Sequence, residues 1–455
     1  MIGAALSRWT LSYFAASLVF LIAGVGLMAA GFGYPFHDIR APETLIVVHI
    51  VAIGWLALLM CGALLQFVPV LVASPLWGGK AGLPALILLL TGLPGLLCGF
   101  SGMAGLMEPP VWLLPASAVL LIAGFAVIVL MLAVTIGRAR PITLPARFVI
   151  VGLACLMAVS VLGGVFAFVL SGQADHPVLL NITGQSIPLH GALGLGGWMS
   201  FTAMGVSYRL LTMFLLSPDD ERRTTRILWW AGTAALTVLG AGAGGFALSR
   251  GDTSTVLLAA FIPGAIAISL YAYDMLAIFL QRKRRAIELN SIASIPAFAS
   301  MVIAVVLALN LPWFGTSDAI IAALVYLFAF GWLSGLSLAQ LYKIVPFLTW
   351  LECYGPVMGR APTPRVQDIV NEKHARRWFC VYFTGVAIAA LALGTGYPAV
   401  FRLASAVNLC AILAIAFQLF RARRLMDVPQ TVRLPKGVVV PHLIYAGRPV
   451  LRRSK

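Results

Sequence analysis

Two histidines interrupt long apolar segments of the 455-residue sequence at related positions. His49 stands near the start of the segment 44–72, and His190 near the start of the segment 188–216. An imidazole that faces lipid without a partner is costly, so histidines within a membrane usually face the interior of a helix bundle. Neutral imidazole is also a preferred ligand of haem iron and copper. Both residues are therefore candidate haem or metal ligands, and the alternative is an interfacial histidine bonded to a loop carbonyl.

The two histidines belong to segments that share a pattern with a third segment. Relative to Trp55, Trp198 and Trp332, a small residue follows at +7, a long polar residue at +11, and proline or threonine at +14. The members are Gly62, Gln66 and Pro69; Gly205, Arg209 and Thr212; and Ala339, Lys343 and Pro346. Such self-similarity indicates an internal repeat. We expect three repeated units, each contributing one special helix.

The pattern also suggests roles for its other members. Small residues allow close approach between helices or between a helix and a flat ligand. Arg209 and Lys343 lie about 16 Å along the helix from their tryptophans, at about 1.5 Å per residue, and are expected to extend to lipid headgroups. Four glycines of the second segment would leave room for a flat macrocycle beside His190: Gly191, Gly194, Gly196 and Gly197.

Other reactive side chains give weaker signals. The six cysteines include no CxxC pair, so they indicate neither a disulfide framework nor a zinc site. No phosphate-binding glycine loop and no nucleophilic-serine motif is present. Asp274 lies near the end of an apolar segment, as an interfacial carboxylate or a proton relay. The pairs His37-Asp38 and Asp175-His176 are either loop surface residues or metal ligands at the mouth of the bundle.

Composition assigns the chain to the membrane. Its hydrophobic fraction is 61% and its charged fraction 10%, whereas soluble domains carry roughly 25% charged residues. Apolar runs of about 18 residues or more are candidate spans. We expect about twelve, at residues 10–31, 44–72, 82–106, 111–137, 147–171, 188–216, 226–248, 254–280, 293–314, 318–350, 378–396 and 399–421.

The expected fold is an all-α polytopic membrane protein. The spans must be helices, because open strands in lipid leave backbone groups without partners. The three special segments are four spans apart, which predicts three pseudo-repeated arcs of four helices. We expect one membrane domain over residues 1–421 and a basic cytoplasmic tail over residues 422–455, extended along the membrane surface.

The distribution of arginine and lysine predicts the orientation. Alternate loops are basic, for example Arg222-Arg223 and Gln281-Arg-Lys-Arg-Arg285, while the intervening loops carry mostly acidic residues. Basic loops stay in the cytoplasm, so both termini are expected there. The net charge of +16 is thus concentrated where it meets anionic lipids, and it indicates no nucleic-acid partner. The sequence indicates no particular protein partner.

Together these features resemble subunit I of the haem–copper oxidase superfamily over residues 10–421. The resemblance rests on the topology and on two strings, His49…Gly54-Trp55…Gly62…Pro69 and Gly331-Trp332…Tyr342-Lys343-Ile-Val-Pro346. It is nearest to short relatives, such as the haem- and copper-containing proteins of bacterial nitric-oxide responses. It implies a bacterial inner-membrane location. It also implies that His49 is a haem ligand and, less directly, that His190 is a copper ligand.

The chain departs from that family where oxygen chemistry occurs. The family's histidine pair in span 7 has no counterpart in Ile227–Gly232, and its span 10 histidines are replaced by Tyr326 and aliphatic residues. We therefore expect an accessory or sensory protein that binds one b-type haem or a copper ion near the periplasmic face, and no enzyme of the usual kind. The alternatives are a carrier for a small solute, metal or haem, and a redox enzyme.

Overall fold

Helices make up all the regular structure that is described. The structure is a computed structural model, and it describes residues 7–218, 221–246, 252–311, 317–435, 438 and 440–447. No strand occurs in these ranges. Eleven of the helical stretches are long and apolar enough to cross a membrane. The prediction of a polytopic helical membrane protein is confirmed at this level.

The helix bounds agree with the expected spans to within a few residues at most ends. Ten helices are continuous and α-helical, whereas three further stretches each contain an irregular segment and are described below. The ten are α1 (Thr10–Ala30), α4 (Gly82–Met103), α5 (Leu113–Gly137), α6 (Leu144–Leu170), α9 (Arg223–Gly245), α10 (Thr253–Leu280), α11 (Leu289–Leu309), α15 (Glu372–Gly394), α16 (Pro398–Arg423) and the short α17 (Gln430–Arg433).

The count of twelve spans is not confirmed, because one expected span is missing from the eleven. That span is the stretch Pro177–Leu215, which contains His190. It is long enough to cross a membrane, but its glycines and its polar side chains make it less apolar than the others. The stretch that carries the candidate ligand is thus also the most polar of the long helices.

The three repeated stretches share a backbone irregularity. Each runs from an α-helix through a π-helical segment into a second α-helix. The first is α2 (Pro42–His49), η1 (Ile50–Ala57) and α3 (Leu58–Leu71); the second is α7 (Pro177–Ala192), η3 (Leu193–Phe201) and α8 (Thr202–Leu215); the third is α13 (Asp318–Tyr326), η4 (Leu327–Ser334) and α14 (Gly335–Tyr354).

The tryptophans of the repeat mark these π-helical segments. Trp55, Trp198 and Trp332 are each the sixth residue of their segment, each follows a glycine, and each is fully buried. Long π-helical segments are rare and frequently mark functional sites. The sequence pattern therefore reports a repeated irregularity of the backbone as well as a repeated set of side chains.

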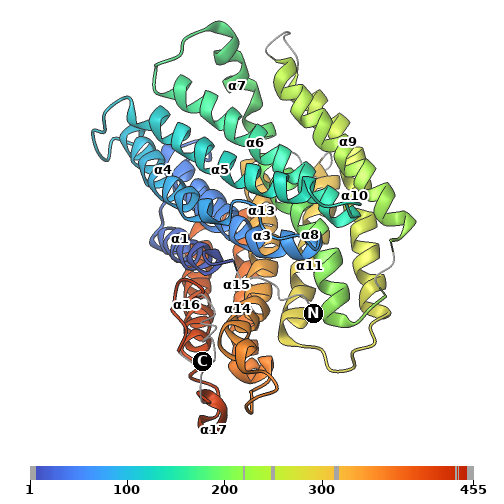
Figure 1. The fold of residues 1–455 in the computed structure, drawn as a ribbon. Coiled ribbons are helices and arrows are strands. Elements are labelled where there is room, and N and C mark those ends of the chain that lie inside the picture. The colour runs from blue at the N-terminus through green and yellow to red at the C-terminus, as the bar shows by residue number, and fades with distance from the viewer. Residues whose placement is uncertain are drawn as a thin grey trace. The chain divides into compact units, whose positions relative to one another are not determined.

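The chain divides into two compact units, which are described separately. Unit 1 comprises residues 1–39, 61–66 and 287–455, and unit 2 comprises residues 40–60 and 67–286. In unit 2, α4, α5 and α6 lie side by side, α9 pairs with α10, and α6 packs on α7, η3 and α8 (Figure 1). In unit 1, α16 packs against α15, α14 and α1, and α11 packs against α14. The predicted division into three arcs of four stays a prediction.

Small residues determine how closely the helices of unit 2 approach. A Cβ atom on Gly95 of α4 would lie 2.3 Å from Ser117 Oγ of α5, and one on Gly92 would lie 3.0 Å from the Ser117 carbonyl oxygen. Glycine at such contacts lets two backbones approach, which is how helices pack where burial from water provides no force. The pair α4–α5 is therefore held by close packing rather than by polar bonds.

The described part of the C-terminal segment is bonded to the rest of unit 1. The Ala446 amide donates to the Arg8 carbonyl at 3.0 Å, and the Gly447 amide donates to Glu352 at 2.7 Å. Tyr445 lies beside Trp9, with ring centroids 6.2 Å apart. The described part of this segment thus packs against α14 and the residues that precede α1, and its predicted course along the membrane surface stays a prediction.

Reporter fusions test the orientation that the basic loops predict. Fusions placed after residues in the loops 218–224 and 282–290 should report cytoplasm, and fusions within 174–184 should report periplasm, because arginine and lysine hold loops on the cytoplasmic side. Paired alkaline phosphatase and fluorescent-protein fusions at each position give the measurement. Reversal of two or more of these loops would refute the orientation.

Candidate functional site

His49 is held in one orientation by a bond to its own helix. It is the last residue of α2 and immediately precedes η1. Its Nδ1 lies 2.8 Å from the Leu45 carbonyl oxygen, and because that oxygen only accepts, Nδ1 carries the proton. The other ring nitrogen, Nε2, therefore has a free lone pair. The ring packs on Phe100 of α4, with centroids 5.0 Å apart.

His190 lies in α7 with its ring against α6. The ring centroid is 5.4 Å from that of Phe166, and a Cβ atom added to Gly163 would lie 3.0 Å from Cε1 of His190. The absence of a side chain at Gly163 thus allows the imidazole to pack directly against α6. The Nδ1 atom of His190 is buried, and no described residue gives it a hydrogen-bond partner. Buried polar atoms without partners are uncommon and require an explanation.

The structure brings the two histidines together within unit 2. Segments η1 and η3 are in contact, and the two imidazoles are close enough to interact electrostatically. One of them presents a free Nε2 lone pair, and the other has a buried Nδ1 without a protein partner. Two imidazoles arranged in this way are suited to bind a ligand, since metal-binding histidines commonly donate their second ring nitrogen to a backbone carbonyl.

The glycines near His190 only partly leave the expected room. Cβ atoms added to Gly191 and Gly196 would meet no atom within 4 Å, and one on Gly194 would make an ordinary contact with Val159 at 3.6 Å. Gly197 is different, because a Cβ atom there would lie 2.6 Å from Cys155 Sγ. Open space is therefore found beside Gly191 and Gly196, whereas Gly197 serves close packing against α6.

The donor set suits a haem better than a copper ion with several protein ligands. Among the described residues, which include every histidine and cysteine, no three histidine, cysteine or acidic side chains are grouped so that they could hold a metal. A haem iron needs only one or two axial ligands, which His49 and His190 can supply. The loop pairs have local roles instead: His176 Nδ1 accepts from the Val178 amide at 3.3 Å, at the start of α7.

Asp274 is a buried carboxylate whose surroundings the sequence did not reveal. It lies in α10, is fully buried, and accepts three hydroxyl hydrogen bonds. The donors are Tyr208 at 2.7 Å, Thr224 at 2.6 Å and Thr225 at 2.9 Å. The sequence suggested an interfacial carboxylate or a proton relay, and neither interpretation included these three hydroxyl partners. The carboxylate joins α8, α9 and α10, and the adjacent threonines at the start of α9 were the signal that could have indicated this.

The long polar residues at +11 of the repeat do not share one role. Gln66 is buried, and its Oε1 accepts from the Ser7 amide at 2.9 Å. Lys343 forms an ion pair with Glu288, whose other oxygen accepts from Gln367 at 2.9 Å. Lys343 was expected to extend to headgroups, so that expectation is wrong. Arg209 is exposed, as expected.

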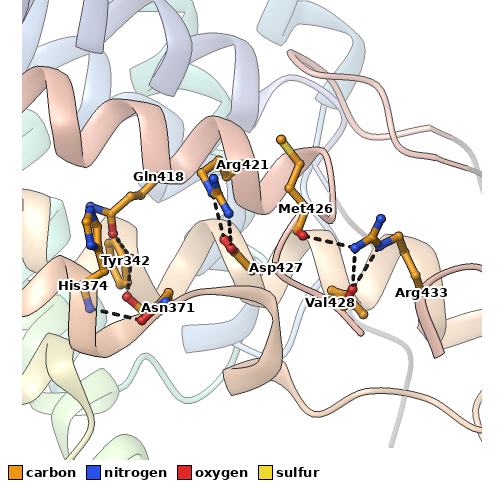
Figure 2. A network of polar contacts seen from close by, with 9 residues as sticks. All are labelled: Tyr342, Asn371, His374, Gln418, Arg421, Met426, Asp427, Val428 and Arg433. Carbon is orange, nitrogen blue, oxygen red and sulfur yellow. Dashed lines mark hydrogen bonds and ion pairs between the residues drawn. The ribbon is translucent and has the colours of Figure 1, made fainter. Parts of the chain in front are cut away.

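Next to Lys343, a polar network joins α14, α15 and α16 of unit 1 (Figure 2). Tyr342 donates to Gln418 Oε1 at 2.5 Å, which links α14 to α16. The Asn371 side chain accepts from the His374 amide at 3.1 Å and so begins α15. Arg421 pairs with Asp427 at 2.5 Å. Because most of these groups are bonded to one another, we interpret the network as structural.

No protein-family model matches this chain, and no curated protein is significantly similar to it. The fold defines a multi-pass helical membrane protein with a pair of histidines inside one unit. The resemblance to subunit I of the haem–copper oxidases therefore rests on the sequence features alone.

Proposed function

We propose that this protein is an accessory or sensory protein of the bacterial inner membrane that binds one b-type haem at His49, on an oxidase subunit I-like fold. The observation that carries the proposal is the state of the two imidazoles. His49 has its tautomer fixed by Leu45 so that Nε2 is a ready ligand, and it lies near His190, whose Nδ1 is buried without a protein partner.

In this proposal, each residue has a defined task. His49 would hold the haem iron through Nε2, and the Leu45 carbonyl orients the ring and increases the basicity of that nitrogen. His190 lies beside the same volume as a second ligand or as a hydrogen-bonding group, and the open side of Gly191 and Gly196 accommodates a flat molecule. When bound, the haem would supply an iron that exchanges one electron or binds a diatomic gas, which suits a sensor.

The experiment is purification from haem-replete cells, followed by a visible spectrum and metal analysis. We expect substoichiometric haem with a Soret band that shifts on reduction. The fixed imidazole of His49 is a good ligand, but the third repeated stretch contains no histidine that could serve as a second ligand opposite it. Absence of both a Soret band and bound copper above background would refute the proposal. Copper in place of haem would retain the site and change its cofactor.

Catalytic reduction of oxygen or nitric oxide is not part of this proposal. The family's binuclear centre needs three copper histidines and a haem ligand, and only two of the six histidines lie within the predicted spans. Purified protein that is given an electron donor and either gas should turn over neither, as measured with gas electrodes. Sustained cyanide-sensitive turnover, after removal of contaminating oxidases, would contradict this expectation.

A carrier is the second candidate, favoured by one observation. Asp274 is a fully buried carboxylate in a helix that is apolar enough to cross a membrane, and buried ionisable groups of that kind often mark substrate or ion pathways. Its three hydroxyl donors also allow a purely structural role. A haem spectrum separates the two candidates, since a carrier would purify without a stably bound chromophore.

A further inference from the structure

The last described residues of the chain, 440–447, lie on a surface of unit 1 that is made by segments distant in sequence. We call these residues the strap, and we call Arg8, Ser12, Glu352 and Arg423 the docking surface. Ser12 belongs to α1, Glu352 to α14 and Arg423 to α16. The strap therefore connects the first helix of the chain to two much later helices of the same unit.

Two side chains of the docking surface bind carbonyl groups of the strap. Arg423 donates to the His442 carbonyl, and the Ser12 hydroxyl donates to the Ile444 carbonyl. Arg423 also forms an ion pair with Glu352 at 3.0 Å, and both members of this pair are buried. The same guanidinium thus binds the strap and its acidic partner.

Two acceptors of the docking surface bind amide groups of the strap. The Ala446 amide donates to the Arg8 carbonyl at 3.0 Å, and the Gly447 amide donates to Glu352 at 2.7 Å. These four hydrogen bonds between described residues all use main-chain atoms of the strap. Every residue except proline offers the same main-chain donor and acceptor. The bonds therefore select a backbone shape rather than a particular sequence.

Side chains add selectivity at two adjacent positions of the strap. The ring centroid of Tyr445 lies 6.2 Å from that of Trp9 and 5.5 Å from the guanidinium carbon of Arg8. Ala446 is buried, whereas the side chain of Ile444 is 54% exposed. The docking surface therefore contacts an aromatic residue that is followed by a small one, and it leaves the residue before them unread.

The docking surface favours being occupied. Arg423 is buried, and no described residue gives its Nε atom a hydrogen-bond partner even while the strap is bound. Departure of the strap would also remove a partner from Arg423 and one from Glu352. Buried polar groups without partners are costly. A peptide main chain, from this chain or from another, supplies both the carbonyl and the amide that these two side chains bind.

The strap can leave the docking surface without the residues that precede it. Arg433 donates to the Val428 carbonyl at 2.8 Å (Figure 2), and the Arg433 carbonyl accepts from Tyr354 of α14 at 2.7 Å. These bonds attach the chain to unit 1 before the strap begins. Displacement of the strap would break its four main-chain bonds and leave this attachment in place.

We propose that the strap is an autoinhibitory segment, which fills a docking surface for a short peptide segment of a partner protein and is displaced by it. The partner segment carries an aromatic residue followed by a small one, since these are the side chains that the surface contacts. The inference is independent of the haem proposal, because the docking surface lies in unit 1, whereas His49 and His190 lie in unit 2.

Peptide binding to the purified full-length protein tests the proposal. The probe is a fluorescent, amidated peptide with the sequence of residues 440–447, and its anisotropy reports binding. Ala446→Glu in the protein places a charge at a buried position and should release the strap. The affinity for the probe should then rise about tenfold or more, because apparent affinity increases with the fraction of open surface. The matched control is Ile444→Glu, at an exposed position, which should bind the probe as the wild type does.

The same two substitutions in the probe should have the converse effect. A probe with Ala446→Glu should not bind, whereas a probe with Ile444→Glu should bind as the unmodified probe does. Hydrogen exchange of the wild type needs no protein variant. The Ile444→Glu probe, whose mass distinguishes it from the strap, should increase deuterium uptake by residues 440–447. Equal affinity of the wild type and the Ala446→Glu protein, or uptake that a saturating probe does not change, would overturn the proposal.

Discussion

Replacing His49 with alanine should abolish haem binding. The Nε2 atom of His49 combines a fixed tautomer with a lone pair that can bind iron, because Leu45 holds the opposite nitrogen. Alanine removes the proposed iron ligand, and His190 alone remains beside the site, since no group of three histidine, cysteine or acidic side chains that could hold a metal occurs among the described residues. The Soret absorbance per mole of protein should fall to background, while the folded yield should be retained.

Two further variants make this result specific. His190→Ala should weaken haem binding without abolishing it, since His190 lies near His49 but no protein group bonds to its Nδ1 atom. His374→Ala is the control, because this exposed histidine lies at the start of α15 in the other unit and is hydrogen-bonded to Asn371 and Trp378. Full haem retention by His49→Ala would refute the cofactor proposal and favour the carrier.

The second large effect concerns the stability of unit 1. Arg423 and Glu352 form a buried ion pair at 3.0 Å, with side-chain exposures of 4% and 10%. Arg423 also donates to Thr349 at 3.0 Å and to the His442 carbonyl, and Glu352 accepts from the Gly447 amide. Replacing Arg423 with leucine leaves a buried carboxylate without its cation, which should lower the free energy of unfolding by about 3–5 kcal/mol.

Denaturation in detergent, followed by helical circular dichroism, measures this loss. The control is Arg226→Leu, which breaks a pair of the same length with Glu221 whose side chains are 62% and 48% exposed, so little change is expected. The double variant Arg423→Leu with Glu352→Leu should recover much of the stability, because no unpaired charge remains. If Arg423→Leu is no more destabilising than Arg226→Leu, the ion pair does not hold the C-terminal segment.

Much of the helical order was predictable, because apolar length alone determines where a chain can cross lipid. The expected span 82–106 is α4, and the expected span 254–280 is α10. The stretch Pro177–Leu215 was harder, since its amino-terminal part, Pro177–Pro188, contains polar residues and two prolines, so its apolar signal starts later than its helix. Hydropathy also does not locate helix ends that are fixed by capping side chains. Asp252, for example, caps the start of α10 by accepting a hydrogen bond from the Ser254 amide.

The sequence identified which residues belong to the candidate site but not how their side chains are arranged. The repeat located His49 and His190 on equivalent helices, where they could face a shared volume. Their positions relative to the tryptophans differ by two residues, however, so the sequence did not determine whether the two rings point the same way. Their environment depends on contacts between distant segments, such as His190 with Gly163 and Phe166. The hydroxyl bonds to Asp274 were missed for the same reason, because they come from residues about 50 and 66 positions away in sequence.

The π-helical segments also bear on how this gene grew. A π-helix closes its hydrogen bonds over one more residue than an α-helix does, and insertion of one codon into a helical region is the simplest genetic route to it. All three segments place their tryptophan at the sixth position, directly after a glycine. A single insertion in an ancestral unit, copied when that unit was duplicated, accounts for all three, whereas later origins require the same accident three times. If the three units arose by duplication, the irregular backbone is older than the full-length chain.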